Sequence, residues 1–365
     1  MRKRVLIVQN EVMSYRKPVY NALARDYDVT LLHSGTPAVE RGDLFRELTV
    51  PVTRVGKFFF QHRVLARLDA SEFDVAIVMF DLWWTNNVRA IFRRGRPPLI
   101  LWGHRHSLSW FANALRYWLM PHAEAHLLYG DEDVHHIVAH GIPVESIFVA
   151  PNTQFVSNSQ DTSHERKHRL LFVGRLQNSK KVDILIEAFE AALPRLPKEI
   201  VLSIVGNGFE EENLKAMTRS LGLDERVIFH GELRSDEALF PLFRESIAYL
   251  TPGFVGLGAI HGFAYGVPTV TTFGPPPGRH GQEFMTLKHG VNALVLESES
   301  LLIEAIAQLS NDPDFSRRLG AAAYRTYRDT RQLDQMLIGF HASIEYATRE
   351  KRPVLSVPNR VRPEP

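Results

Sequence analysis

Short apolar runs alternate with amphipathic stretches along most of the chain. Nearly continuous apolar runs are typical of parallel strands that are covered on both faces. Such runs predict a first set of strands at 4–9, 28–35, 74–80, 98–104, 125–130 and 146–152, and a second set at 169–174, 200–206, 226–231, 246–252, 269–273 and 293–296. Because helix-like segments separate most of them, the pattern predicts two doubly wound α/β domains.

Helix periodicity places the remaining elements. Apolar residues from Val182 to Leu193 recur every three or four positions, as on a helix packed against a sheet. The stretch 333–347 has the same periodicity after the second sheet is complete, so we expect it to pack across the seam. We predict an N-terminal domain at 1–155, a second domain at 156–332, a returning helix at 333–349 and a loose Pro-rich tail at 350–365, with the polar segment 152–168 as linker.

The composition limits the class of protein to which the chain can belong. With 365 residues and 45% hydrophobic content, the chain is long enough for two folded domains. Lys and Arg number 43 against 41 Asp and Glu, so no overall field favours nucleic acid. Zero cysteines exclude disulfides and thiolate metal sites. Since no apolar run reaches the roughly 18 residues of a membrane span, and the first residues turn polar too early for a signal peptide, we expect a cytoplasmic protein.

Ligands in open α/β sheets bind at the carboxyl ends of the strands. The turn after the first strand, QNEVMSYRKP, holds no glycine, so the dinucleotide-binding fingerprint is absent there, and no Walker A loop occurs anywhere. In the second domain, Gly174 and Arg175 end a strand and Lys180 comes near the start of the next helix. Two cations at a helix N-terminus suit a diphosphate, although both could equally be solvated surface residues.

A second glycine-rich turn occurs in TPGFVGLGAIHGFAYG, residues 251–266. Gly253, Gly256 and Gly258 let a ligand approach the backbone closely, and the predicted helix at 257–265 would present free N–H groups. His261 lies in the first turns of that helix. It could bind a ribose or sugar hydroxyl, or it could be a packed core histidine.

The order and spacing of several motifs resemble a known family. GRLQNSKKVDILIEAF, LSIVGNG, VIFHGEL, the glycine-rich turn and YGVPTVTT are similar to the nucleotide-sugar-binding domain of family-4 retaining glycosyltransferases, also called group 1. The resemblance covers about residues 168–330 well and the first domain in outline. It implies the GT-B fold: two facing Rossmann-like domains, with the donor bound to the second, the acceptor to the first, and a C-terminal crossover helix.

The resemblance also implies site residues. Arg175 and Lys180 would neutralise the donor diphosphate, and His104, with His106 as competitor, would lie on the acceptor side together with Arg16. Glu283 matches a recurring acidic position, with an exposed loop carboxylate as the alternative. The implied donor-binding residues are Gly174, Gly231, Glu232, Leu233, Gly253, Phe254, Val255, Gly256, Leu257, Gly258, His261 and Glu283.

One departure from the family pattern concerns two glutamates eight residues apart, of which the first contacts the donor sugar and the second the ribose. Gly253 and His261 occupy these positions here. The passage is similar to a subgroup written S-P-G-N-V-G-L-T-A-M-H. Backbone amides near Gly253 and the imidazole of His261 would then replace the two carboxylates, which leaves the donor sugar open.

The implied chemistry needs cations rather than a protein nucleophile. Negative charge grows on the leaving phosphate, so pre-placed cations lower the barrier. No metal is expected. The D-x-D sequence at 131–133 could hold a divalent ion, but its position at a helix start favours capping by Asp131.

Basic and aromatic residues raise the question of a membrane. The segment 56–68 mixes three phenylalanines with cations, and 88–98 contains Arg89, Arg93, Arg94 and Arg96. This composition suits an anionic bilayer surface, although the phenylalanines could be core residues and the arginines a solvated face.

These observations predict a metal-independent, retaining glycosyltransferase that uses a nucleoside-diphosphate sugar and a glycan or lipid-linked acceptor, in surface polysaccharide or glycolipid assembly. The alternatives are a nucleotide-sugar epimerase of similar architecture and an inactive glycan-binding scaffold. Guanine and uracil are both compatible with the sequence as the donor base.

Overall fold

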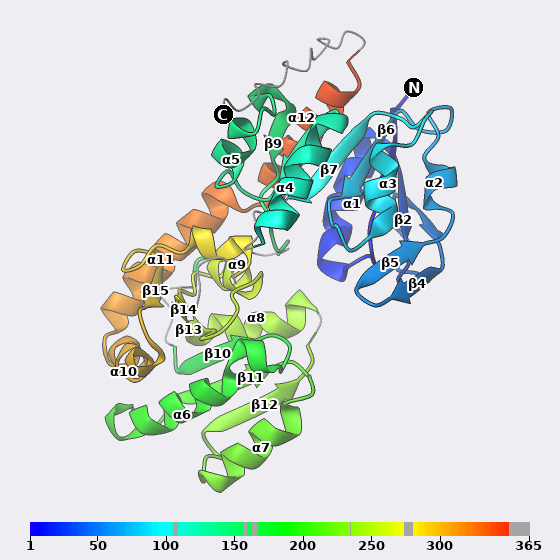
Figure 1. The fold of residues 1–365 in the computed structure, drawn as a ribbon. Coiled ribbons are helices and arrows are strands. Elements are labelled where there is room, and N and C mark those ends of the chain that lie inside the picture. The colour runs from blue at the N-terminus through cyan, green and yellow to red at the C-terminus, as the bar shows by residue number, and fades with distance from the viewer. Residues whose placement is uncertain (105–108, 157–158, 163–166, 234, 274–279, 350–365) are drawn as a thin grey trace, which may run out of the picture.

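The computed structural model describes residues 1–349 except 105–108, 157–158, 163–166, 234 and 274–279. Two parallel sheets form the two halves of the molecule, and helices cover their faces (Figure 1). This confirms the α/β architecture of two doubly wound domains. The predicted tail at 350–365 lies outside the described residues.

The first half is built on a seven-stranded sheet. Its strands are, in spatial order, β3 (Arg46–Thr49), β2 (Asp28–His33), β1 (Arg4–Val8), β6 (Val75–Met79), β7 (Leu99–His104), β8 (Ala125–Leu128) and β9 (Ile147–Val149). Its helices are α1 (Lys17–Asp26), α2 (Val64–Arg67), α3 (Thr85–Ile91), α4 (Trp110–Leu119) and α5 (Val134–Ala139).

The second half is built on a six-stranded sheet. Its strands are, in spatial order, β12 (Val227–Gly231), β11 (Val201–Val205), β10 (Arg169–Val173), β13 (Ser246–Leu250), β14 (Thr269–Thr272) and β15 (Ala293–Leu296). Its helices are α6 (Val182–Ala192), α7 (Glu211–Ser220), α8 (Asp236–Arg244), α9 (Gly258–Ala264), α10 (Leu302–Asn311) and α11 (Pro313–Thr330), with short 3-10 turns η4 (Asn178–Lys180) and η6 (Gln282–Thr286). All twelve predicted strands are present.

Strand β1 shows why its apolar run is continuous. Val5 and Ile7 point into one hydrophobic core, whereas Leu6 and Val8 belong to another core on the opposite face. Side chains alternate across a strand, so a sheet covered on both sides needs apolar residues at every position.

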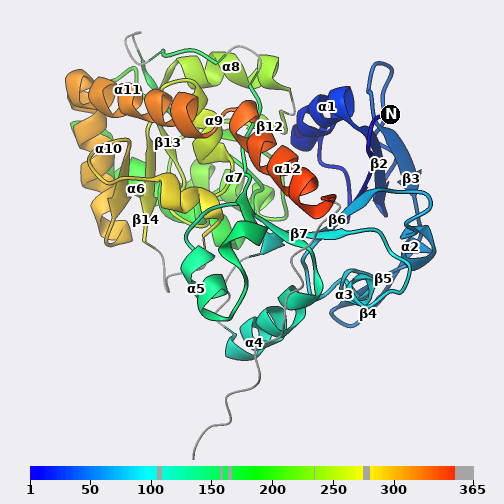
Figure 2. The same cartoon turned by 90° about the horizontal axis from the view of Figure 1, so that it is seen from above.

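Helix α12 (Leu333–Ala347) returns from the second half to the first (Figure 2). Phe340 and Ile344 lie in the same core as β1, and the Phe340 ring contacts the Trp102 ring edge-on with centroids 4.9 Å apart. A Cβ atom at Gly339 would lie 2.2 Å from the carbonyl oxygen of Val149. The helix therefore docks closely on β9, as expected for a crossover helix.

Three strands were not predicted. Strand β3 is a polar edge strand, and β4 (Val52–Val55) pairs antiparallel with β5 (Phe58–Gln61). The aromatic run at 58–60 therefore belongs to a hairpin, and the Phe59 ring stacks on Trp84 with centroids 4.8 Å apart. Because none of these strands has a buried apolar run, the pattern used to find the others did not apply.

The described part of the predicted linker forms hydrogen bonds with residues of the second half and with a residue just before α12. The backbone N–H groups of Gln160 and Thr162 donate to the carbonyls of Ala264 and Tyr265, at 3.1 and 3.3 Å. The Thr153 hydroxyl donates to the carbonyl of Arg331, just before α12. Residues 160–162 therefore pack against the second half, and the exact domain boundaries stay a prediction.

Candidate functional site

The loops that leave β10, β11 and β12 are joined through their backbones. The N–H of Gly174 donates to Val205 at 3.0 Å, and the N–H of Gly206 donates to Gly231 at 2.7 Å. Gly206 has a φ of +135°, and a Cβ there would lie 1.8 Å from the carbonyl oxygen of Gly174. Only glycine fits this contact, so the three strand ends form one fixed surface.

A hollow of about 500 Å³ opens at these strand ends. Arg175 is exposed there, and Glu232 accepts a hydrogen bond from Asn207 at 3.1 Å. The lining residues are Arg175, Leu176, Gln177, Asn207, Gly208, Phe209 and Glu232. The position at the carboxyl ends of parallel strands is the one where α/β proteins bind ligands. Sequence analysis missed Asn207 and Phe209, although the GNGF turn directly follows a predicted strand.

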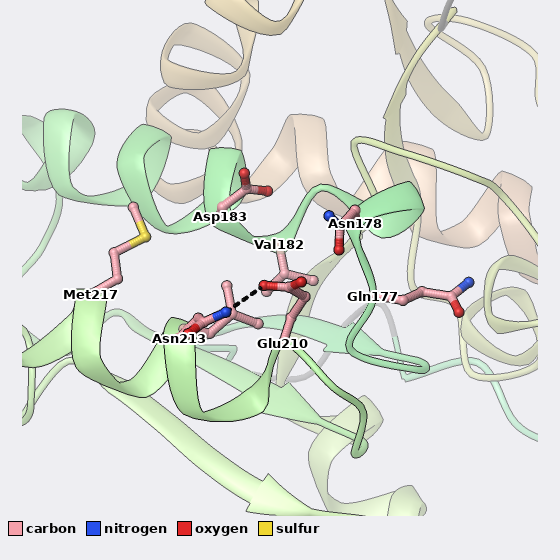
Figure 3. A pocket seen from close by; sticks show the side chains of 8 residues that line it. Gln177, Asn178, Val182, Asp183, Glu210, Asn213 and Met217 are labelled. Carbon is pink, nitrogen blue, oxygen red and sulfur yellow. Dashed lines mark hydrogen bonds between the residues drawn. The ribbon is translucent and has the colours of Figure 1, made fainter.

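A smaller hollow of about 140 Å³ lies between the starts of α6 and α7 (Figure 3). Gln177 lines both hollows. At the start of α7, the Asn213 side chain donates a hydrogen bond to the Glu210 carboxylate at 3.0 Å, and both residues line this smaller hollow. It is lined by neutral and acidic side chains, so it does not favour a phosphate.

Lys180 is half-buried beside the glycine-rich turn. Its Nζ donates to the carbonyl of Phe254 at 2.7 Å and lies 4.9 Å from the centre of the Phe254 ring. Burial lowers the pKa of Lys180 to about 8, although the nearby Glu283 carboxylate acts in the opposite direction. Arg175 lines the larger hollow, whereas Lys180 lies outside its described lining. Arg175 therefore lies at the larger hollow, and Lys180 lies against the glycine-rich turn.

Gly253 lies against the turn that carries Lys180. The N–H of Phe254 donates to the carbonyl of Ser179 at 2.8 Å. A Cβ at Gly253 would lie 2.1 Å from the Ser179 oxygen and 2.7 Å from the carbonyl carbon of Lys180. Backbone fills the space on that side, so this loop has no room for the glutamate that the resembled family carries there.

His280 holds the glycine-rich turn from the other side. Its Nδ1 accepts from the N–H of Val255 at 3.1 Å, and its Nε2 donates to the carbonyl of Phe273 at 2.9 Å. Because an amide only donates and a carbonyl only accepts, these bonds fix a neutral ring with the proton on Nε2. Sequence analysis missed His280, which belongs to no recognised motif.

Gly256, Leu257 and Gly258 lead into α9. A Cβ at Gly258 would lie 2.4 Å from the Tyr249 hydroxyl oxygen, so packing requires glycine there. At Gly256 the nearest atom would be 3.6 Å away, on Phe254, which is an ordinary contact. The first N–H groups of a helix have no acceptor within it. The backbone at 256–258 therefore keeps donors that a ligand could use.

His261 lies in a buried hydrogen-bonded group. Its Nε2 lies 2.8 Å from Asp236 Oδ1, and the Tyr265 hydroxyl donates to both Asp236 oxygens at 2.9 and 2.8 Å. Burial and the Asp236 carboxylate raise the pKa of Tyr265, so the hydroxyl keeps its proton and donates. The structure thus gives His261 an internal partner that the sequence did not indicate. Its contact with a donor hydroxyl stays a prediction.

Glu283 is buried between the two halves. Glu283 is only 4% exposed, and its carboxylate accepts a hydrogen bond from Asn152 Nδ2 at 2.7 Å. Its charge also acts on Lys180 and on the half-buried Arg331. The alternative of an exposed loop carboxylate is therefore wrong. Asn152 follows β9 of the first half; sequence analysis had placed it where the predicted strand 146–152 meets the linker, without a role at the site.

The acceptor side is described in part. Arg16 is buried, donates to the Tyr129 hydroxyl at 2.8 Å and lies 4.5 Å from the centre of the Trp102 ring. His104 ends β7, but its side chain is outside the described part of the structure, as is the whole of His106. The structure therefore places Arg16 near the carboxyl ends of the first sheet and leaves the two histidines as predictions.

The D-x-D sequence did not cap as expected. Helix α5 begins at Val134, with Asp133 at the cap position and no side-chain capping bond, so the prediction of a cap at Asp131 is wrong. Among residues 1–349 outside the gaps named above, no cluster of three or more His, Cys, Asp or Glu side chains is arranged to hold a metal ion.

The predicted basic cluster is divided between two roles. Arg89 and Arg94 are exposed. Arg93 is half-buried and donates to the carbonyl of Leu68 at 3.1 Å. Arg96 donates to the carboxylate of Glu124 at 2.8 Å and to the carbonyl of His122 at 2.7 Å, so it ties loops together. Only part of this cluster could therefore face a membrane.

The close contact at Gly253 leads to a test on stability. We expect Gly253→Ala to lower the free energy of unfolding by about 1–3 kcal/mol, because the new methyl group meets backbone atoms that cannot move aside cheaply. Gly256→Ala is the matched control and should stay within about 0.5 kcal/mol of the wild type. Urea denaturation followed by circular dichroism measures both. Equal stability of the two variants would contradict the proposed lack of space.

The buried group around His261 leads to a second test. His261→Glu introduces the acidic residue that the resembled family carries there but places it beside Asp236, so we expect a loss of about 2–4 kcal/mol in the free energy of unfolding. Adding Asp236→Asn removes the second charge and should recover much of that loss, whereas Asp236→Asn alone serves as the control. Thermal and urea denaturation measure the stability of the three variants. A His261→Glu protein as stable as the wild type would show that positions 261 and 236 are not coupled.

Comparisons with known proteins agree with this architecture. Residues 156–326 match the family model described as Glycosyl transferases group 1. The chain is 29% identical over 172 residues to mannosylfructose-phosphate synthase of Agrobacterium fabrum, which covers 43% of this chain and 36% of that protein. It is 28% identical over 164 residues to lipopolysaccharide 1,6-galactosyltransferase of Salmonella typhimurium, covering 42% and 44%. The matches therefore span less than half the length of these relatives.

Solved structures match over nearly the whole chain. The Anabaena protein HepE, crystallised with UDP and glucose, has a TM-score of 0.70 at 15% identity and covers 94% of this chain and 99% of its own. The lipopolysaccharide outer core galactosyltransferase WaaB, in its apo form, has a TM-score of 0.65 at 15% identity with the same coverage. The chain therefore has the GT-B fold, and the family match over its second half supports a glycosyltransferase of group 1.

Proposed function

We propose that the protein is a retaining, metal-independent glycosyltransferase that moves a sugar from a nucleoside-diphosphate sugar to a glycan or lipid-linked acceptor. The observation that carries the proposal is Lys180, a half-buried cation held against the glycine-rich turn at a strand's carboxyl end. Its Nζ bonds a backbone carbonyl rather than a carboxylate, and burial lowers its pKa. A diphosphate is the partner that such a cation lacks.

Arg175 and Lys180 would approach the diphosphate from two sides. Arg175 would enter from the larger hollow, where the base and ribose would lie against Gly231, Glu232 and Leu233. Lys180 and the backbone N–H groups at 256–258 would meet the phosphate next to the sugar. Pre-placed positive charge stabilises the leaving diphosphate as the bond to the sugar breaks. UDP is the nucleotide we favour, because HepE was crystallised with it.

The transfer step needs no protein nucleophile in this proposal. The bond from the anomeric carbon to the diphosphate oxygen breaks, and the acceptor oxygen bonds to that carbon on the same face. The acceptor's proton passes to the leaving phosphate oxygen. Arg16 and His104, with His106 as competitor, would position the acceptor. The name of the Salmonella relative supports lipopolysaccharide or other surface polysaccharide assembly as the setting. We propose a cytoplasmic location for this step.

The function is tested with the purified protein and a panel of intact UDP- and GDP-sugars. We expect UDP to bind, and transfer to continue in EDTA. Arg175→Ala and Lys180→Ala should each lower the rate of transfer at least a hundredfold while the protein stays folded. Arg219→Ala and Lys215→Ala on α7 are the matched controls. Failure to bind any nucleoside diphosphate would favour a scaffold; conversion of the donor to an epimeric sugar without acceptor would favour an epimerase; loss of activity in EDTA would remove the metal-independent mechanism.

The lowered pKa of Lys180 gives the proposal a pH signature. Below pH 8 the free protein carries the ammonium group that UDP needs, whereas above pH 8 binding must first take up a proton. We therefore expect UDP affinity to be steady from pH 7 to 8 and to fall by up to about tenfold per pH unit above that. The Lys180→Arg variant stays positively charged over this pH range, so its affinity for UDP should change less with pH than that of the wild type. Calorimetric titration from pH 7 to 9.5 measures this, and identical profiles would contradict the role of Lys180.

A further inference from the structure

Helix α4 has apolar residues on the face that an ordinary surface helix makes polar. Trp110, Phe111 and Trp118 are 79%, 64% and 57% exposed, and Ala114 is exposed between them. These positions follow i, i+1, i+4 and i+8, so they lie on one side of the helix. The buried side carries Asn113, Tyr117 and Leu119. The helix therefore turns large aromatic side chains outward.

A neighbouring element extends this surface. Phe92, directly after α3, is 49% exposed, and its ring centroid lies 5.7 Å from that of Trp118 and 5.1 Å from that of His122. Figure 2 shows α3 and α4 beside each other at the outer edge of the first half. Phe92, Trp110, Phe111 and Trp118 are called the aromatic patch below.

Positive charge borders the aromatic patch. Arg89 on α3 and Arg94 just after Phe92 are both exposed, and neither forms an ion pair within the residues the structure covers. The nearby carboxylate of Glu124 is already paired with Arg96 at 2.8 Å. Two unpaired arginines beside exposed indole and phenyl rings favour a partner that is both apolar and anionic.

We propose that the aromatic patch binds the surface of an anionic lipid bilayer. Tryptophan and phenylalanine enter the interface at headgroup level, and Arg89 and Arg94 meet the lipid phosphates. The surface differs from the one suggested by the segment 56–68, whose phenylalanines belong to the β4–β5 hairpin. The two exposed arginines complement an anionic surface, which favours a bilayer of anionic lipid over a neutral protein partner. Binding to lipid does not depend on sugar transfer.

Flotation of the 365-residue protein with lipid vesicles tests this surface. We expect the wild type to float with vesicles of phosphatidylcholine and phosphatidylglycerol at 7:3, and far less with phosphatidylcholine alone. Phe111→Ser with Trp118→Ser should reduce bound protein at least tenfold. Arg89→Glu with Arg94→Glu should reduce binding to the anionic vesicles by about fivefold or more per arginine. Leu44→Ser with Ile338→Ser, at exposed apolar residues outside the patch, is the control and should float like the wild type.

Circular dichroism melting and UDP binding without vesicles establish that each variant is folded. Wild-type flotation by the Phe111→Ser, Trp118→Ser protein would overturn the proposal, as would a wild type that ignores anionic vesicles. A concentration-dependent dimer that this double variant abolishes, with no lipid binding, would overturn it in favour of a contact between two copies. A protein that floats but transfers no sugar would contradict the proposed function alone.

Discussion

A backbone-to-backbone contact fixes the candidate site. Gly253 lies against Ser179 and Lys180 so closely that no side chain fits between them, and the Phe254 N–H bonds the Ser179 carbonyl. The contact joins the loop after β10 to the loop after β13. It also sets the Lys180 ammonium beside the Phe254 carbonyl. Because backbone atoms make the contact, the position of the cation depends on the absence of a side chain at 253 more than on any neighbouring side chain.

The same constraint explains how acidic groups are arranged in the second half. A glutamate at 253 is sterically excluded, and at 261 an imidazole bonds to Asp236, which comes from α8. A carboxylate therefore lies beside α9, but the neighbouring helix α8 supplies it. The Tyr265 hydroxyl is shared between both oxygens of this carboxylate, so the half-buried charge has donors from α9 and from its C-terminal cap.

Sequence patterns predicted what depends on local periodicity. Buried parallel strands such as β1 need apolar residues at every position, and α12 was found at its full range because its apolar stripe is regular. The edge strand β3 and the β4–β5 hairpin lack that signal. The contacts of His280 and Asp236 join residues 25 positions apart, and Asn152 reaches Glu283 across 131 positions. Such pairs depend on tertiary packing, which one sequence does not reveal.

Glu283 connects the electrostatics of both halves. It is buried, accepts from Asn152 of the segment that follows β9, and opposes the effect of burial on the Lys180 pKa. A diphosphate bound at Lys180 would add negative charge near this carboxylate, which favours the protonated lysine further. Above pH 8, binding of the donor would therefore be accompanied by proton uptake at Lys180. The carboxylate that acts on Lys180 is thus also the one that hydrogen-bonds Asn152, where the chain leaves the first sheet.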